Sequence, residues 1–155
     1  MNNKISNIDS SILDDLITGR VEPYIYAFST NTIPNYLKVG DTYRPVDTRI
    51  NEWKKLFPNL VKEFSAPARI DNNTIFRDYT VHSFLIDERG RERLLPSTYS
   101  NIVYYSKEFF KNATIKDLND AIIDIQKSAS ENSGKYQLYT TKRLPITFIY
   151  LNSAT

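Results

Sequence analysis

The sequence predicts an α+β fold in which helices flank a small central antiparallel β-sheet, within a single domain of 155 residues. Three observations indicate this class. Short runs of aromatic and β-branched residues, typical of strands, are separated by turn residues. Between those runs, apolar residues recur at helical spacing. The loop between the first two strand-like runs is too short for a crossover, so these two strands must be antiparallel.

The amino-terminal segment Asn7–Gly19 predicts a short helix. Asp9 or Ser10 would cap it, and Gly19 would end it. Four apolar residues would form its buried face: Ile12, Leu13, Leu16 and Ile17. We expect this helix to pack on the sheet as an amino-terminal addition to the fold.

The next stretch predicts a β-hairpin. Tyr24–Phe28 has the composition of a strand, residues 30–35 contain the turn formers asparagine and proline, and Tyr36–Val39 resumes as a strand. Successive strand residues point to opposite faces of a sheet. We expect the second strand to end at Gly40, in a tight turn whose positive φ angle requires glycine.

A helix is predicted directly after this hairpin. Its start is compatible with Pro45, because the first turn of a helix tolerates proline. Pro58 would help to end it. Arg49 lies at the edge of its apolar stripe, which consists of Val46, Ile50, Trp53 and Phe57.

Further strands and a second helix are expected in the middle of the chain. Residues 60–69 predict a third strand, in which Pro67 indicates an edge or an end. A helix over residues 74–87 would be capped by Asn72 or Asn73. After a turn at Arg89–Gly90, a short strand at Leu94–Leu95 would be closed by Pro96.

The last third of the chain predicts a helix and a hairpin. Residues 97–101 are loop-like, and residues 102–110 are ambiguous between strand and helix. Thr114 and Asp117 form a variant of the capping box before a strongly amphipathic helix. Beyond a loop over residues 130–134, residues 135–140 and 144–150 are expected to pair as a carboxy-terminal β-hairpin.

Composition narrows the class of protein. The net charge of +2 does not by itself indicate a nucleic-acid-binding protein. No cysteine is present, which excludes disulfides and thiolate metal sites and is compatible with a reducing compartment. No apolar run approaches the roughly 18 residues of a membrane span, and the polar amino terminus lacks a hydrophobic signal core. We therefore expect a cytoplasmic protein without membrane contact.

Two motifs in the first half resemble those of the GIY-YIG nuclease domain. Tyr24-Ile25-Tyr26 resembles its first motif, and Lys38-Val39-Gly40 resembles its second, with Arg49 nine positions later. The match is closest to the phage- and mobile-element-type branch, whose second motif commonly reads Lys-Ile-Gly. In that family the two motifs pair in a small antiparallel sheet, and the following helix carries a catalytic arginine. Here Tyr24 replaces a glycine and Lys38 replaces a tyrosine.

The resemblance extends to the second predicted helix. In this branch a glutamate there binds the divalent metal and precedes a histidine by four positions. The matching residues here are Asp78 and His82, with aspartate in place of glutamate. The segment Ser106–Phe110 also resembles a later Gly/Ser-x-Glu-aromatic-Phe segment. The resemblance covers roughly residues 22–112, and domains of this branch are often fused to helicases or other DNA-processing domains.

The resemblance implies a metal-dependent endonuclease that hydrolyses DNA phosphodiesters with Mg²⁺ or Mn²⁺. Tyr26 would orient or activate the water with the help of Lys38, and Arg49 would neutralise phosphate charge. Asp78 would bind the metal, since Mg²⁺ often takes only one or two protein carboxylates. His82 would relay a proton, hold Asp78 or contact phosphate.

Each of these residues also has an ordinary structural interpretation. A strand tyrosine is usually packing, a lone helical arginine is usually solvated, and Gly40 satisfies a turn. Asp78 and His82, one turn apart, commonly form no more than a surface hydrogen bond. Only their shared order and spacing favours the catalytic interpretation.

Charge placement favours a DNA partner. Tyr43, Arg44, Lys54 and Lys55 are predicted to contact nucleic acid, because cations meet phosphates and aromatic rings stack on bases. Tyr36 and Trp53 are interleaved with these cations, while three acidic residues dilute them. Two alternatives remain open: a catalytically inactive nucleic-acid-binding module of a larger helicase- or restriction-like protein, and a protein-interaction domain that uses exposed tyrosines.

Overall fold

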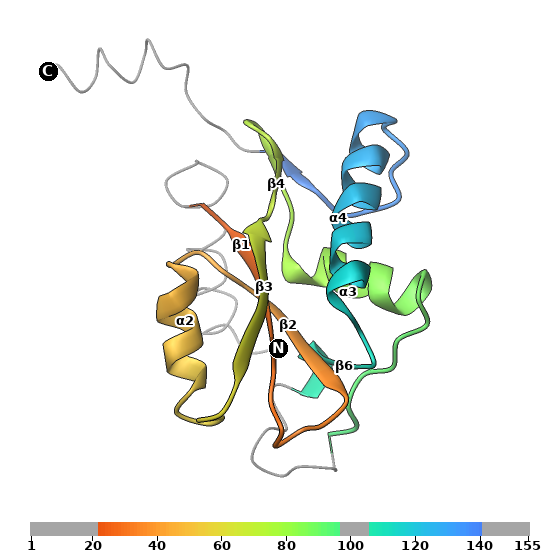
Figure 1. Cartoon of the computed structure of the whole chain (residues 1–155). Coiled ribbons are helices and arrows are strands. Elements are labelled where there is room, and N and C mark those ends of the chain that lie inside the picture. Colours follow the sequence, from red (N-terminus) through yellow and green to blue (C-terminus); the bar gives the residue numbers. More distant parts are fainter. Residues whose placement is uncertain (1–21, 97–105, 141–155) are drawn as a thin grey trace, which may run out of the picture.

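The computed structural model describes residues 22–96 and 106–140. In these ranges the chain has an α+β fold built on a four-stranded antiparallel sheet of order β3-β1-β2-β6. Its strands are β1 (Tyr24–Ser29), β2 (Tyr36–Thr42), β3 (Val61–Pro67) and β6 (Phe109–Lys111). Helix α2 (Val46–Trp53) lies on one side of this sheet, and α3 (Asp78–Asp87) and α4 (Ile115–Ser130) lie on the other (Figure 1).

A second, smaller sheet extends beyond the first. It has the order β4-β5-β7 and consists of β4 (Arg69–Asp71), β5 (Thr74–Ile75) and β7 (Tyr139–Thr140). A short 3₁₀ turn, η2 (Ser106–Glu108), leads directly into β6. None of the helices in the described ranges combines the length and apolarity needed to cross a membrane.

The predicted hairpin of β1 and β2 is confirmed. Its register places Tyr26 opposite Gly40 and Phe28 opposite Lys38. Because side chains alternate along a strand, these residues share the face that α2 covers, while Ile25 faces the other way. The hairpin therefore contributes to two different cores.

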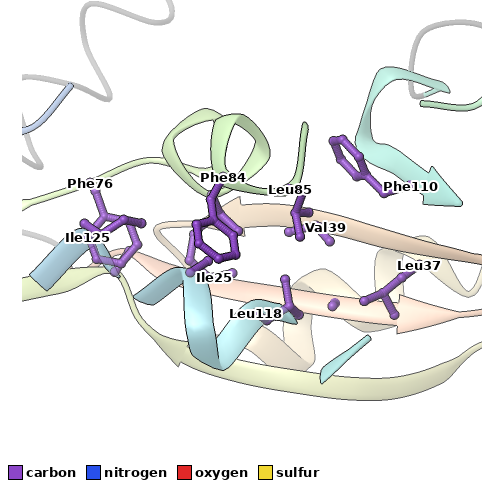
Figure 2. Close-up of a cluster of buried hydrophobic side chains, with 13 residues drawn as sticks. Ile25, Leu37, Val39, Phe76, Phe84, Leu85, Phe110, Leu118 and Ile125 are labelled. Carbon is purple, nitrogen blue, oxygen red and sulfur yellow. The ribbon is translucent and has the colours of Figure 1, made fainter. Parts of the chain in front are cut away.

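The core between the sheet and helices α3 and α4 is aliphatic in its centre. Ile25, Val39, Leu85 and Leu118 are almost fully buried there, and Phe110 closes one end (Figure 2). The amphipathic α4 begins with the predicted capping box: Thr114 Oγ1 accepts from the Asp117 backbone N–H at 3.1 Å, and Asp117 Oδ2 accepts from that of Thr114 at 3.0 Å.

The core on the other face is largely aromatic. The centroid of the Phe28 ring lies 5.7 Å from that of Trp53 and 5.9 Å from that of Phe57. Phe109 completes this aromatic cluster. Ile50 and Trp53 are buried as the apolar stripe of α2 predicted. Phe57 is also buried, although the helix itself ends at Trp53.

The prediction for Gly40 was wrong. Strand β2 continues through Gly40 to Thr42, so the glycine lies inside a strand and not in a turn. The glycines of the described ranges with positive φ are Gly90 and Gly134. The backbone conformation at position 40 therefore does not require glycine. The side chains packed over this position must explain why a glycine stands here.

The start of the second helix was also predicted too early. Thr74 and Ile75 form β5, and α3 begins at Asp78. The asparagines belong to the turn before β5, where Asp71 Oδ1 accepts from the Asn73 backbone N–H at 2.8 Å. Asp41 of β2 instead accepts from the first helical N–H, that of Asp78, at 3.0 Å.

Three smaller predictions have mixed outcomes. Pro67 does end β3, which is an edge strand, but the predicted strand over residues 60–69 is split at Ala68 between two sheets. Leu94–Leu95 does not form a strand. The neighbouring residue Arg93 instead forms an isolated antiparallel β-bridge with Phe110. Of the predicted carboxy-terminal hairpin, Tyr139–Thr140 pairs with β5. Residues 144–150 lie outside the described ranges, as do the predicted helix over 7–19 and the loop over 97–101.

Candidate active site

The phenol of Tyr26 is the centre of a buried polar cluster under α2. Lys38 Nζ and Trp53 Nε1 each donate a hydrogen bond to Tyr26 Oη, both at 2.7 Å. An indole N–H and an ammonium group can only donate, so the phenolic oxygen accepts from both. Two donors from different elements thus converge on this one oxygen.

Lys38 is almost fully buried, with 1% of its surface exposed. Besides Tyr26, its ammonium group contacts Glu108 Oε1 at 2.8 Å. It also lies 4.2 Å from the centroid of the Trp53 ring. A charge taken out of water is tolerated only with such partners, so these contacts hold the Lys38 ammonium beside the phenol.

Gly40 lies directly beneath this contact. A Cβ atom on Gly40 would lie 2.4 Å from Lys38 Nζ and 3.0 Å from both Glu108 Oε1 and Tyr26 Oη. A strand glycine often marks a close approach of other groups. The missing side chain leaves the space in which the phenol, the ammonium group and the carboxylate meet.

Arg49 approaches the cluster from α2 and is about one-third exposed. Its guanidinium carbon lies 4.8 Å from the Trp53 ring centroid, and its Nη1 donates to Glu52 Oε1 at 3.0 Å. Burial opposes its charge, yet the pKa of Arg49 is raised, because the Tyr26 phenol and the Glu52 carboxylate lie next to it. Arg49 thus joins Tyr26 and Lys38, as the sequence predicted.

Asp78 borders the same cluster from the first turn of α3. Burial, and then the nearby carboxylates of Asp41 and Glu108, raise its pKa from 3.8 to about 7, against the opposing charges of Lys38 and Arg77. Asp41 is itself neutralised by Arg77, whose Nε donates to it at 2.6 Å. Asp78 is therefore a half-buried carboxyl whose negative charge lacks sufficient compensation.

This environment suits a divalent cation bound through few protein ligands. Within residues 22–96 and 106–140, no group of three or more histidine, cysteine or acidic side chains is arranged to hold a metal ion. Mg²⁺, however, keeps most of its waters and often takes one or two carboxylates. The uncompensated charge of Asp78 fits such an ion.

The contacts of His82 are with β2 and β6. Its Nε2 donates to the backbone carbonyl of Val39 at 2.7 Å, and its ring packs 4.8 Å from that of Phe110. Burial lowers its pKa to about 4, so the ring is neutral at pH 7. The contact ties α3 to β2, and the predicted catalytic role of His82 stays a prediction.

The predicted nucleic-acid contacts are distributed around α2. Tyr43 and Arg44 precede the helix and are partly exposed, while Lys54 and Lys55 follow its last residue and are exposed. Trp53, in contrast, is only 3% exposed and cannot stack on a base. Its indole belongs to the buried cluster around Tyr26.

Four further residues belong to this site although the sequence predicted no role for them there: Asp41, Glu52, Trp53 and Glu108. Glu108 was indicated only by the segment Ser106–Phe110, and Trp53 was interpreted as part of an apolar stripe. The polar atoms of Glu108, Trp53 and Asp41 meet residues far away in sequence, so spacing along the chain carries no signal for those contacts. Glu52 is different, because it lies three positions after Arg49 on the same helix, a spacing that indicates an ion pair.

Compared with known proteins, the chain matches no protein-family model, no curated protein and no solved structure.

Proposed function

We propose that this chain is a GIY-YIG-type endonuclease domain that hydrolyses DNA phosphodiesters with Mg²⁺ or Mn²⁺. The observation that carries the proposal is the contact of Tyr26 with Lys38 above Gly40, next to Arg49. These four residues come from two strands and a helix. They converge although sequence spacing alone did not require it, and the sheet with helices on both faces is compatible with this family.

Tyr26 acts on the attacking water. For this step Tyr26 must first release its own hydroxyl proton to solvent; the phenolate oxygen, held by the donors Lys38 and Trp53, then takes one proton from the water, so that hydroxide attacks phosphorus and Tyr26 is left as a neutral phenol. Glu108 holds the Lys38 ammonium in position through their 2.8 Å contact. The buried surroundings strengthen these electrostatic interactions, because little water screens them.

Arg49 stabilises the charge on the phosphate oxygens. Tyr26 has no exposed surface, whereas Arg49 beside it is partly exposed and carries a long, flexible side chain. We expect Arg49 to contact the phosphate and to release Glu52, its partner at 3.0 Å, when the phosphate binds.

Asp78 would hold the metal ion. When bound, Mg²⁺ or Mn²⁺ neutralises charge on the phosphate and on the leaving oxygen. Asp41 and Arg77 fix the first turn of α3, and so they set the position from which the Asp78 carboxylate faces the cluster.

Cleavage assays with the full chain test the proposal. We expect Mg²⁺ or Mn²⁺ to support cutting of duplex DNA, and Arg49→Ala to reduce the rate at least about 100-fold. Lys116→Ala is the matched control, because it removes an exposed cation from α4, on the opposite side of the sheet. Equal cutting by wild type and Arg49→Ala, or no cutting with either metal, contradicts the catalytic proposal.

A catalytically inactive nucleic-acid-binding module, within a larger helicase- or restriction-like protein, is the second candidate. Two observations favour it: Tyr26 is fully enclosed, and aspartate replaces the glutamate expected at position 78. Such a module would bind DNA in a salt-dependent way in the presence of EDTA, and Asp78→Ala would not weaken that binding.

A further inference from the structure

Glu52 on α2 is bound by two arginines at once. Arg44 donates two hydrogen bonds to Glu52, from Nη1 to Oε2 and from Nη2 to Oε1, each at 2.7 Å. Arg49 Nη1 donates a third to Oε1 at 3.0 Å. Hydrogen bonds from Arg44, and then from Arg49, lower the pKa of Glu52 to about 2. One carboxylate thus occupies a fork made by guanidinium groups from two segments of the chain.

The same fork suits a phosphodiester. Guanidinium groups bind carboxylates and phosphates with the same planar, two-pronged geometry. Arg44 Nε is, moreover, a buried donor without an acceptor among the described residues. A phosphate, with its larger set of oxygens, offers acceptors that the Glu52 carboxylate does not.

A hollow of about 510 Å³ opens beside Arg44, between the start of α2 and the strands β1 and β3. Tyr43, 40% exposed, and Lys62 contribute to its wall, and the Arg44 guanidinium lies 6.0 Å from the Tyr43 ring centroid. Aromatic rings next to cations accept the bases of nucleic acids whose phosphates the cations bind. The hollow therefore has room and an aromatic wall for the nucleotide that adjoins the bound phosphate. Glu22 and Asp47 also line it, and Lys62 pairs with Asp47 at 3.2 Å, so its phosphate-binding charge comes from Arg44.

We propose that Arg44 and Arg49 form a phosphodiester-binding site next to Tyr26, and that Glu52 occupies this site until a nucleic-acid phosphate displaces it. The inference rests on the nucleic-acid substrate class of the proposed function, but not on catalysis. Displacement of Glu52 releases Arg49, which lies next to Tyr26. Glu52 thus competes with the substrate for its two arginines.

Binding of labelled duplex DNA to the full chain, measured in EDTA at several salt concentrations, tests this site. Since each exposed ion pair is modest, we expect Glu52→Gln to tighten binding about threefold to tenfold. Arg44→Ala should weaken binding and reduce the salt slope by about one. In the Arg44→Ala background, the gain from Glu52→Gln should shrink.

Asp120→Asn is the matched control. Asp120 also binds two cations, Arg89 at 3.0 Å and Lys116 at 2.7 Å, but it lies on α4. Equal tightening by Glu52→Gln and Asp120→Asn would show that only net charge matters and would overturn the proposal. So would weaker binding by a folded Glu52→Gln variant, since Glu52 would then merely orient the arginines. Glu52→Asp shortens the side chain and draws the carboxylate back from the arginines, so it should give an intermediate gain in DNA affinity. It tests the same proposal if the Glu52→Gln variant does not fold.

A competition arm with inorganic phosphate separates a nucleic-acid site from a site for small anions. If Glu52→Gln strengthens competition by phosphate but not DNA binding, the nucleic-acid assignment is wrong. Cleavage assays are independent of these outcomes. Tightening without any cutting would refute the catalytic proposal alone, and cutting without tightening would refute this inference alone.

Discussion

At the scale of single residues, the candidate site depends on the absence of a side chain at Gly40. Tyr26, Lys38 and Glu108 meet in the space that a side chain at position 40 would fill. The sequence motif identified Gly40, but the expected reason, a turn, was wrong. The physical reason is steric, and it links the glycine directly to the positions of the proposed reacting groups.

Gly40→Ala should displace the Lys38 ammonium, because the new Cβ would lie 2.4 Å from it. Overpacking of this kind typically costs about 1–3 kcal/mol. We expect a similar loss in the free energy of unfolding, measured by urea denaturation, together with a loss of DNA cleavage. In a double-mutant cycle with Lys38→Ala, the two stability effects should be less than additive; strict additivity would argue against the steric explanation.

Asp78 makes the stability of the protein depend on pH. Its pKa is raised from 3.8 to about 7, so the folded chain binds this proton more readily than the unfolded chain. The carboxyl therefore costs nothing below about pH 4, and its cost grows as the pH rises toward 7. One pKa unit corresponds to about 1.4 kcal/mol.

We accordingly expect Asp78→Asn to stabilise the metal-free protein by about 1–3 kcal/mol at pH 8, and by much less near pH 4.5. Adding Mg²⁺ at pH 8 should stabilise wild type and not the variant. Urea denaturation in EDTA and in Mg²⁺ measures both effects. Asp47→Asn, which removes an exposed carboxylate on α2, is the control; the same pH dependence in both variants would contradict the assignment.

At the scale of elements, two helices begin in different ways. Helix α4 carries its own cap, in which Thr114 and Asp117 bond each other's backbone N–H groups. Helix α3 has no side-chain cap of its own, and Asp41 from β2 binds its first N–H group. The first arrangement is local and was predicted, whereas the second depends on the sheet and was not.

Thr114→Ala should remove half of the α4 capping box. Loss of such a cap typically costs about 1 kcal/mol, and urea denaturation should show a loss of this size. Asn119→Ala, at an exposed position of the same helix, is the control and should not destabilise the protein. Because α4 lies on the side of the sheet away from α2, DNA binding by the folded variant should be unchanged.

At the scale of the whole molecule, one sheet separates two cores with different tasks. The core under α3 and α4 is apolar and supplies stability through burial (Figure 2). The core under α2 surrounds the Lys38 ammonium group with aromatic rings and encloses the phenol of Tyr26. The face toward α3 and α4 thus carries the apolar core, and the face toward α2 carries the enclosed polar cluster of Tyr26 and Lys38.

Leu118→Ala tests this division. Leu118 is fully buried in the first core, and truncation of a buried leucine costs about 2–5 kcal/mol. We expect a loss of this size in urea denaturation, with unchanged DNA affinity at temperatures where the variant is folded. Ile123→Ala, at a position 62% exposed on the same helix, should have little effect on either. A drop in DNA affinity of folded Leu118→Ala would show that the two faces are coupled.

The sequence by itself determined what depends on near neighbours in the chain. The alternation of β1 and β2, the apolar stripe of α2 and the capping box of α4 all follow from short-range spacing, and all are confirmed. The order and spacing of Tyr26, Lys38 and Arg49 also indicated a common site, and these three side chains do meet.

Only the tertiary structure decided which polar groups meet across the fold. Glu108 reaches Lys38 and Asp41 caps α3, while His82 turns to the carbonyl of Val39. Each of these contacts joins residues that are more than thirty positions apart. Burial makes an unpaired polar group costly, so each takes the partner that the packed elements bring within reach. That partner depends on how the elements pack, which local sequence patterns do not determine.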